Sequence, residues 1–288
     1  MATSETITVR EITANGLTFR CRESGSEGEP VILLHGFPET SHMWVGLIPA
    51  LVAAGYRVLA PDQRGYSPGA RPEGKEHYTY ADIAGDVFAL ADAWGADRFH
   101  LVGHDWGAGA GWSAVAMNPG RIASWSALSV PHIGAFGRAI REDADQANRS
   151  QYITFFQEPG VAEAALSADD YAALKAIWTE SSPEEVAEYL SVFRQPGALT
   201  AALNWYRGSA GISPDNQPAA FGDVHLPTLL IWGNGDQAIG RKGVEDGAQF
   251  MKGYYRFVEL DAGHWLTQEK PDEVRDEIIA HLQKHPIS

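Results

Sequence analysis

Short runs of apolar residues recur along this chain, separated by segments with helical spacing. Six runs are continuous and rich in branched side chains, which is typical of strands buried on both faces of a parallel sheet. They cover residues 31–36, 57–62, 99–105, 125–131, 227–233 and 254–260. Four segments between them are long enough to be crossover helices, namely 44–54, 80–94, 107–117 and 272–283. The alternation predicts an α/β fold with a doubly wound, mostly parallel sheet.

The N-terminal part has a different pattern, because apolar or β-branched residues alternate there with polar ones. Residues 7–14 and 17–24 have the alternation of strands with one exposed face. They meet at Asn15 and Gly16, a dipeptide that favours a tight hairpin turn. Two antiparallel strands therefore precede the six buried runs, and the sheet is predicted to have eight strands.

The regular alternation stops between residues 132 and 224. This segment is rich in Ala, Glu and aromatic residues at helical spacing and has no convincing buried strand. We expect a helical lid at 132–224, inserted into a core made of residues 1–131 and 225–288. A chain of 288 residues fits one large domain with such an insertion.

Composition narrows the kinds of partner. The 37 acidic and 22 basic side chains give a formal charge of −15, which repels phosphate backbones and anionic lipid heads. A single cysteine cannot form an internal disulfide. We find no signal-peptide pattern and no apolar stretch long enough for a membrane span. We expect a cytoplasmic protein that binds a small molecule and no nucleic acid or membrane, as a monomer or a homodimer.

The segment 99–111, FHLVGHDWGAGAG, carries the clearest chemical signal. A buried strand ends at Asp105 and small residues then begin a helix, as in the turn where α/β-hydrolases expose a nucleophile. Gly103 and Gly107 suit the strained backbone and close packing of that turn. Most such enzymes have serine here, whereas a carboxylate would attack a saturated carbon and form an alkyl ester. Taken alone, Asp105 could equally be a residue that caps the following helix.

An ester on Asp105 needs a stabilised oxyanion and a base that activates water. Residues 30–38, PVILLHGFP, resemble the strand and loop that supply one oxyanion-hole N–H, here from Phe37, while Trp106 would supply the second. The chain order of nucleophile, acid and histidine makes His264 the candidate base.

Two carboxylates compete to orient His264. Asp236 follows the strand predicted at 227–233 and is the preferred acid, while Asp261 is the rival because it is close to His264 in sequence. The reaction expected of Asp105, His264 and Asp236 needs neither a metal nor a cofactor, so we expect none.

Five motifs, HGFPE, DQRGYS, GHDWGA, WGNGD and GHW, together resemble the epoxide hydrolases of the α/β-hydrolase fold, over almost the whole chain. The resemblance implies two lid tyrosines that donate to the epoxide oxygen. These match Tyr152 in the segment 151–163 and Tyr206 in the Asn-Trp-Tyr-Arg element at 204–207. An alkoxide is a poor leaving group, which is the chemical reason for two phenol donors.

Two alternatives remain. Haloalkane and haloacid dehalogenases share the scaffold and the aspartate, but haloalkane dehalogenases usually add an Asn in the HGxP loop or a second Trp, and this loop has Phe37. Trp106 and Gly109 also leave no arginine clamp for a carboxylate beside the nucleophile. A silent hydrolase fold that only binds small molecules would lack the nucleophile, the base or the acid.

Lid shape decides which substrates fit, and the plausible pocket walls are Phe136, Phe156, Trp178 and Trp205.

Overall fold

A single eight-stranded sheet forms the centre of the protein, in the order β1-β2-β4-β3-β5-β6-β7-β8. The structure is a computed structural model that describes residues 6–208 and 221–287. The strands are β1 (Thr8–Ala14), β2 (Leu17–Ser24), β3 (Glu29–Leu34), β4 (Tyr56–Pro61), β5 (Phe99–His104), β6 (Ile122–Leu128), β7 (Thr228–Gly233) and β8 (Tyr255–Leu260). From β4 to β8 every neighbouring pair is parallel, whereas β2 is antiparallel to both β1 and β4. The predicted fold class is confirmed.

The β1–β2 hairpin turns at Asn15 and Gly16, as predicted. Both residues have positive φ, 51° and 74°. Asn and Gly tolerate that conformation better than other residues, and a two-residue turn with both φ positive matches the twist of the strands it joins.

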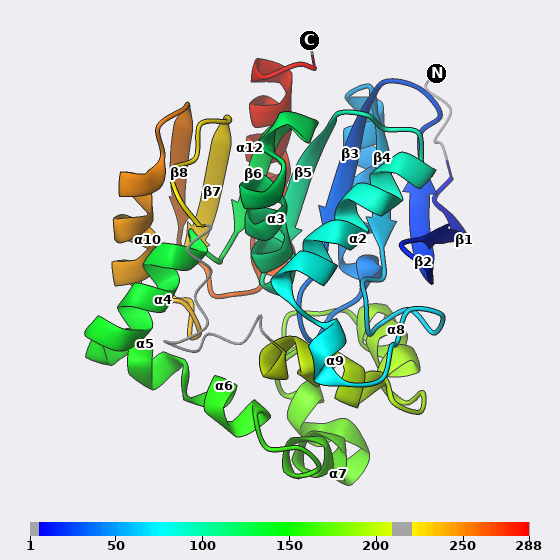
Figure 1. The fold of residues 1–288 in the computed structure, drawn as a ribbon, viewed down its shortest axis with the longest axis vertical. Coiled ribbons are helices and arrows are strands. Elements are labelled where there is room, and N and C mark those ends of the chain that lie inside the picture. The colour runs from blue at the N-terminus through cyan, green and yellow to red at the C-terminus, as the bar shows by residue number, and fades with distance from the viewer. Residues whose placement is uncertain (1–5, 209–220, 288) are drawn as a thin grey trace.

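Helices cover both faces of the sheet. In Figure 1, α2 (Tyr80–Ala93) and α3 (Trp106–Met117) lie on the near face, and α12 (Pro271–Lys284) lies on the far face. The other core helices are α1 (Ile48–Ala53), α10 (Arg241–Gly247) and the short α11 (Leu266–Glu269). Small residues let α3 approach closely, because a side chain at Gly111 would overlap the indole of Trp125 on β6.

Two of the predicted elements have a boundary that is wrong by three residues or more. The helix predicted at 44–54 is a 3₁₀ turn at Ser41–Trp44 followed by α1, with Pro49 in its first turn. Proline fits the first turn of a helix but lacks the N–H that an interior position needs. The helix α1 therefore begins at Ile48, one residue before Pro49. The strand predicted at 125–131 is β6, which starts and ends three residues earlier. Ser129 has a φ of 66° and breaks the extended backbone.

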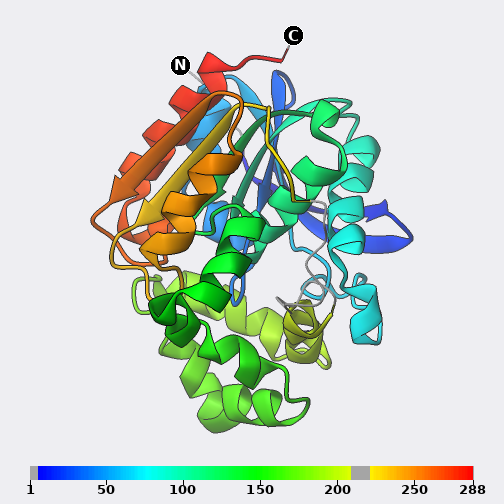
Figure 2. The ribbon, with the colours of Figure 1, turned by 60° about the vertical axis from the view of Figure 1, so that its left-hand side comes forward.

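Six helices of the described residues fall within the predicted insertion. They are α4 (Ile133–Glu142), α5 (Ala144–Arg149), α6 (Gln151–Phe156), α7 (Val161–Lys175), α8 (Pro183–Phe193) and α9 (Ala198–Arg207). Figures 1 and 2 show α5 to α9 gathered beyond one end of the sheet, while α4 runs beside α10. Residues 209–220 of the predicted lid lie outside the described residues.

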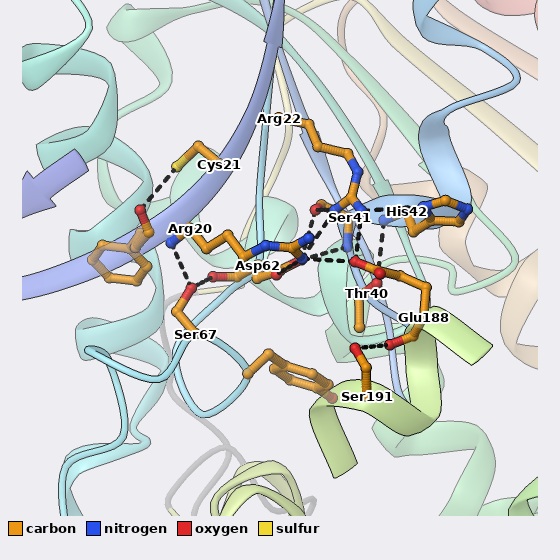
Figure 3. A network of polar contacts seen from close by, with 12 residues as sticks. Arg20, Cys21, Arg22, Thr40, Ser41, His42, Asp62, Ser67, Glu188 and Ser191 are labelled. Carbon is orange, nitrogen blue, oxygen red and sulfur yellow. Dashed lines mark hydrogen bonds and ion pairs between the residues drawn. The ribbon is translucent and has the colours of Figure 1, made fainter. Parts of the chain in front are cut away.

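An ion-pair network docks the lid helix α8 on the core (Figure 3). Glu188 of α8 lies 2.8 Å from Arg20 and 2.6 Å from Arg22, two residues of β2. Arg20 also donates to Asp62, and Arg22 donates to Ser41. Because Arg22 and Asp62 are buried, these contacts satisfy charges that would otherwise be costly to bury.

Candidate active site

Asp105 occupies a strained turn between β5 and α3. Its φ of 52° and ψ of −120° are rare for a residue with a side chain. A side chain at Gly36, Gly103 or Gly107 would overlap neighbouring atoms, so the glycines on both sides of Asp105 are needed for the close packing predicted above. Asp105 precedes α3, yet its side chain makes no capping hydrogen bond. The carboxylate is therefore available for other contacts.

Two backbone N–H groups bind the Asp105 carboxylate. The N–H of Phe37 donates to Oδ1 across 2.8 Å, and the N–H of Trp106 also hydrogen bonds to the carboxylate. These are the two residues predicted to form an oxyanion hole. Donors held in this way stabilise negative charge on the oxygen they contact.

His264 lies between two carboxylates. Its Nδ1 is 2.7 Å from Oδ2 of Asp236, and its Nε2 is 3.4 Å from Oδ2 of Asp105. Asp236 is fixed in turn, because its Oδ1 accepts the N–H groups of Ala238 and Ile239 at 2.8 and 2.9 Å. The rival Asp261 is exposed. The structure thus brings together Asp105, His264 and Asp236.

Burial and charge oppose each other in this group. Burial raises the pKa of Asp105, but the hydrogen bond and positive charge of His264 outweigh it, so the net pKa lies below the usual value. Burial lowers the pKa of His264, but the charges of Asp236 and Asp105 raise it well above the usual value. The resting site therefore holds an ionised Asp105, ready to act as a nucleophile.

Tyr152 and Tyr206 share two cavities with Asp105. The two cavities have volumes of about 190 and 40 Å³. Asp105 and both tyrosines line each of them. Tyr152 comes from α6 and Tyr206 from α9, and their rings lie 6.2 Å apart between centroids. Burial and the charge of Asp105 raise the pKa of both phenols. Both hydroxyls therefore keep their protons and can donate them.

Comparison with known proteins places the chain in a family. Residues 29–271 match the family model described as alpha/beta hydrolase fold. The chain belongs to the alpha/beta hydrolase fold family.

Its relatives in this family include several named epoxide hydrolases. The chain is 36% identical to epoxide hydrolase A of Mycobacterium tuberculosis, over 96% of this chain and 97% of that protein. It is 35% identical to the AB hydrolase superfamily protein YfhM of Bacillus subtilis, over 94% and 96% of the two chains. The crystal structure of epoxide hydrolase A from Mycobacterium thermoresistibile superposes with a TM-score of 0.83 at 33% identity, covering 98% of this chain and all of that one. The predicted resemblance to epoxide hydrolases is confirmed.

Within this alpha/beta hydrolase site the predicted pocket walls divide into two groups. Phe156 lines the larger of the two cavities and Phe136 lines the smaller one. Among the described residues that line the two cavities, Trp205 and Trp178 are absent. Trp205 is buried behind Trp106, and its indole N–H donates to a backbone carbonyl of the core. Trp178 is buried against other lid aromatic residues.

The sequence reasoning missed polar residues that hold the loop carrying His264. Glu269 accepts the N–H of Gly263 at 2.6 Å and that of Trp265 at 3.2 Å, one on each side of the histidine. His104, next to Asp105, hydrogen bonds to the carbonyl of His264 at 2.9 Å. His104 directly precedes Asp105 in the GHDWGA motif, but its contact with His264 joins residues 160 positions apart, so no local pattern indicates it. Glu269 follows His264 closely and could have been singled out by that spacing.

Proposed function

We propose that this protein is an epoxide hydrolase, which converts an epoxide and water to a vicinal diol through a covalent ester on Asp105. One observation carries the proposal: a buried carboxylate and two phenols, one buried and one partly buried, line the same cavities. The carboxylate supplies a nucleophile for carbon, and the phenols supply donors for the ring oxygen. Relatives named as epoxide hydrolases support this pairing.

In the first step Asp105 attacks a ring carbon of the epoxide. Oδ1 is held by the N–H of Phe37, so Oδ2 is the oxygen free to form the new C–O bond. The bond between that carbon and the ring oxygen breaks, and the oxygen takes a proton from Tyr152 or Tyr206. The rings of Trp106 and Tyr206 pack edge to face with their centroids 4.9 Å apart, which helps to hold the Tyr206 phenol in the cavity that Asp105 lines.

In the second step water releases the diol. Ester formation removes the charge of Asp105 that helps to raise the pKa of His264, so the imidazolium gives its proton to the tyrosinate and becomes a neutral base. His264, oriented by Asp236, then takes one proton from water, and the resulting hydroxide attacks the carbonyl carbon of the ester. The N–H groups of Phe37 and Trp106 stabilise the oxyanion that forms. The ester C–O bond then breaks, the diol oxygen takes the proton from His264, and the acidic proton left on Asp105 passes to His264, which restores the resting imidazolium and carboxylate.

A dehalogenase would use the same aspartate but would not need phenol donors, because halide leaves without a proton. Turnover against a panel of epoxides and haloalkanes, with products identified, separates the two. We expect diols from epoxides and no halide release.

The tyrosines and the histidine can be tested separately. Replacing both Tyr152 and Tyr206 by Phe should abolish epoxide turnover, while Tyr255→Phe, on the edge strand β8, should leave it unchanged. His264→Ala should accumulate a covalent adduct, visible as a mass increase on the Asp105 peptide. Retained halide release in the double tyrosine variant would instead support the dehalogenase, and absence of the adduct would contradict the two-step scheme.

For its cellular setting we propose a cytoplasmic enzyme that meets only its epoxide and water, as a monomer or a homodimer. Its one cysteine, Cys21, is buried and burial raises its thiol pKa, so it is poorly placed for disulfide chemistry. Among the described residues, no helix has the length and apolar character needed to cross a bilayer. Fractionation of cells and light scattering of the purified protein test these two points.

A further inference from the structure

A buried glutamine of the lid is hydrogen bonded to the loop that carries Asp236. Gln146 lies on α5 and is fully buried. Its Nε2 donates to the carbonyl of Ala238 at 2.8 Å, and its Oε1 accepts the N–H of Gly240 at 2.7 Å. The same Nε2 donates to Ser150 at 3.0 Å. Gln146 therefore uses both ends of its amide, and two of its partners belong to the core.

The bonded loop is the one that sets the direction of the Asp236 carboxylate. Oδ1 of Asp236 accepts the N–H groups of Ala238 and Ile239, which leaves Oδ2 directed at His264. Gln146 hydrogen bonds to Ala238, whose own N–H binds Asp236, and to Gly240, which directly follows Ile239. A shift of the loop at Ala238 would therefore rotate or displace the carboxylate that orients His264.

We propose that Gln146 is a positioning residue for the hydrolytic step, acting from the lid by fixing the loop that holds Asp236 against His264. This inference rests on the proposed function. It assigns to the lid a part in the second half of the reaction, whereas Tyr152 and Tyr206 serve the first.

The amide side chain of Gln146 suits the two backbone groups that it binds. The loop presents a carbonyl and an N–H to the lid, and a neutral amide offers a donor and an acceptor side by side. A carboxylate could accept from Gly240 but would repel the carbonyl of Ala238. An apolar side chain of similar length would leave buried backbone groups without partners, which is unfavourable.

The loop has a second anchor, so loss of Gln146 should loosen it without detaching it. Arg149, also on α5, donates from Nη1 to the backbone carbonyl of Asp236 at 2.5 Å. We therefore expect a variant of Gln146 to fold and to retain Asp105, both tyrosines and their cavities. Its defect should be confined to the step that uses His264.

The test measures formation and decay of the Asp105 adduct separately. Wild type, Gln146→Met and Gln146→Glu are mixed with a turned-over epoxide, quenched at intervals, and the mass of the Asp105 peptide is followed. We expect adduct decay to fall at least tenfold in Gln146→Met, and less in Gln146→Glu, which keeps the acceptor for Gly240. Adduct formation should stay within about twofold of wild type in both.

The pH profile of decay distinguishes positioning from general loosening. The charge of Asp236 raises the pKa of His264, so a displaced Asp236 raises it less. The acid limb of the decay rate should therefore move to lower pH in Gln146→Met. Gln195→Leu is the matched control, because Gln195 accepts from Arg71 of the core at 2.9 Å, outside the Asp236 loop. That variant should leave both rates and the pH profile unchanged.

Unchanged decay in Gln146→Met, or an equal fall of formation and decay, would overturn the inference. An unmoved acid limb would overturn it too, since the loop would then not act through His264. Should Gln146→Met fail to fold, Gln146→Glu carries the same comparison. Failure of the proposed function would appear earlier and differently, as wild-type protein that forms no adduct on Asp105.

Discussion

Nδ1 of His264 and Oδ2 of Asp236 lie 2.7 Å apart, although the two residues are 28 positions apart in sequence. This contact leaves Nε2 of the imidazole facing Asp105. If Asp236 orients His264 as we propose, Asp236→Asn should slow adduct decay by about 10²- to 10⁴-fold, since the neutral amide neither holds the same tautomer nor stabilises the imidazolium. Adduct formation should change far less. Rapid quench with peptide mass analysis measures both rates, and equal losses in the two would contradict this role.

The contact between Phe37 and Oδ1 of Asp105 predicts the path of oxygen. Because Oδ1 is held in the oxyanion hole, Oδ2 should enter the diol and be replaced by oxygen from water. A single turnover in ¹⁸O-labelled water should put one label on the Asp105 peptide and none in the diol. Label in the diol, with none on the peptide, would mean that water attacks the epoxide directly.

Burial of the phenols predicts an alkali-tolerant first step. The pKa of Tyr152 and that of Tyr206 are raised, first by burial and then by the charge of Asp105. Both stay protonated as the pH rises through the ordinary tyrosine value of 10.0, so adduct formation should not decline there. Tyr206→Phe should slow formation by about 10²- to 10⁴-fold at every pH. A decline of wild-type formation centred at the ordinary value would show that the phenols are not shielded.

The ion pair between Glu163 and Arg207 predicts a loss of stability in acid. Arg207 follows Tyr206 and is buried, and Glu163 contacts it at 2.6 and 2.9 Å. The hydrogen bonds from Arg207 lower the pKa of Glu163 from 4.5 to about 2. Because the folded value is the lower one, the stabilisation is present above pH 4.5 and is lost as the pH falls toward about 2.

Glu163→Gln should remove this part of the pH dependence. At neutral pH it should cost about 1.5–3 kcal/mol of unfolding free energy, because a charged hydrogen-bond partner of a buried guanidinium is lost. Denaturant unfolding from pH 7 to pH 3 measures both effects. Glu180→Gln, at an exposed lid position, is the control and should follow wild type. A parallel pH dependence in Glu163→Gln and wild type would refute the assignment.

The elements predicted most successfully depend on neighbours in the chain. The alternation of 17–24 gave β2 with the same bounds, and Asn15 with Gly16 gave the turn before it. The strand, the glycines and the small residues around Asp105 predicted its turn, because that conformation is decided within a few residues. The first turn of α1 and the end of β6 were misjudged, since single residues with special backbone demands moved those boundaries.

The amino-acid sequence by itself determined the α/β sheet, its helical insertion, the family and the position of a carboxylate at the turn after β5. All of these follow from local periodicity, backbone preference and short motifs. Only the tertiary structure decided that Asp236 rather than Asp261 contacts His264, that Trp205 lies behind the cavities while Tyr206 lines them, and that Gln146 reaches the core. Those outcomes depend on how distant segments pack against one another, which no pattern along a single chain encodes locally.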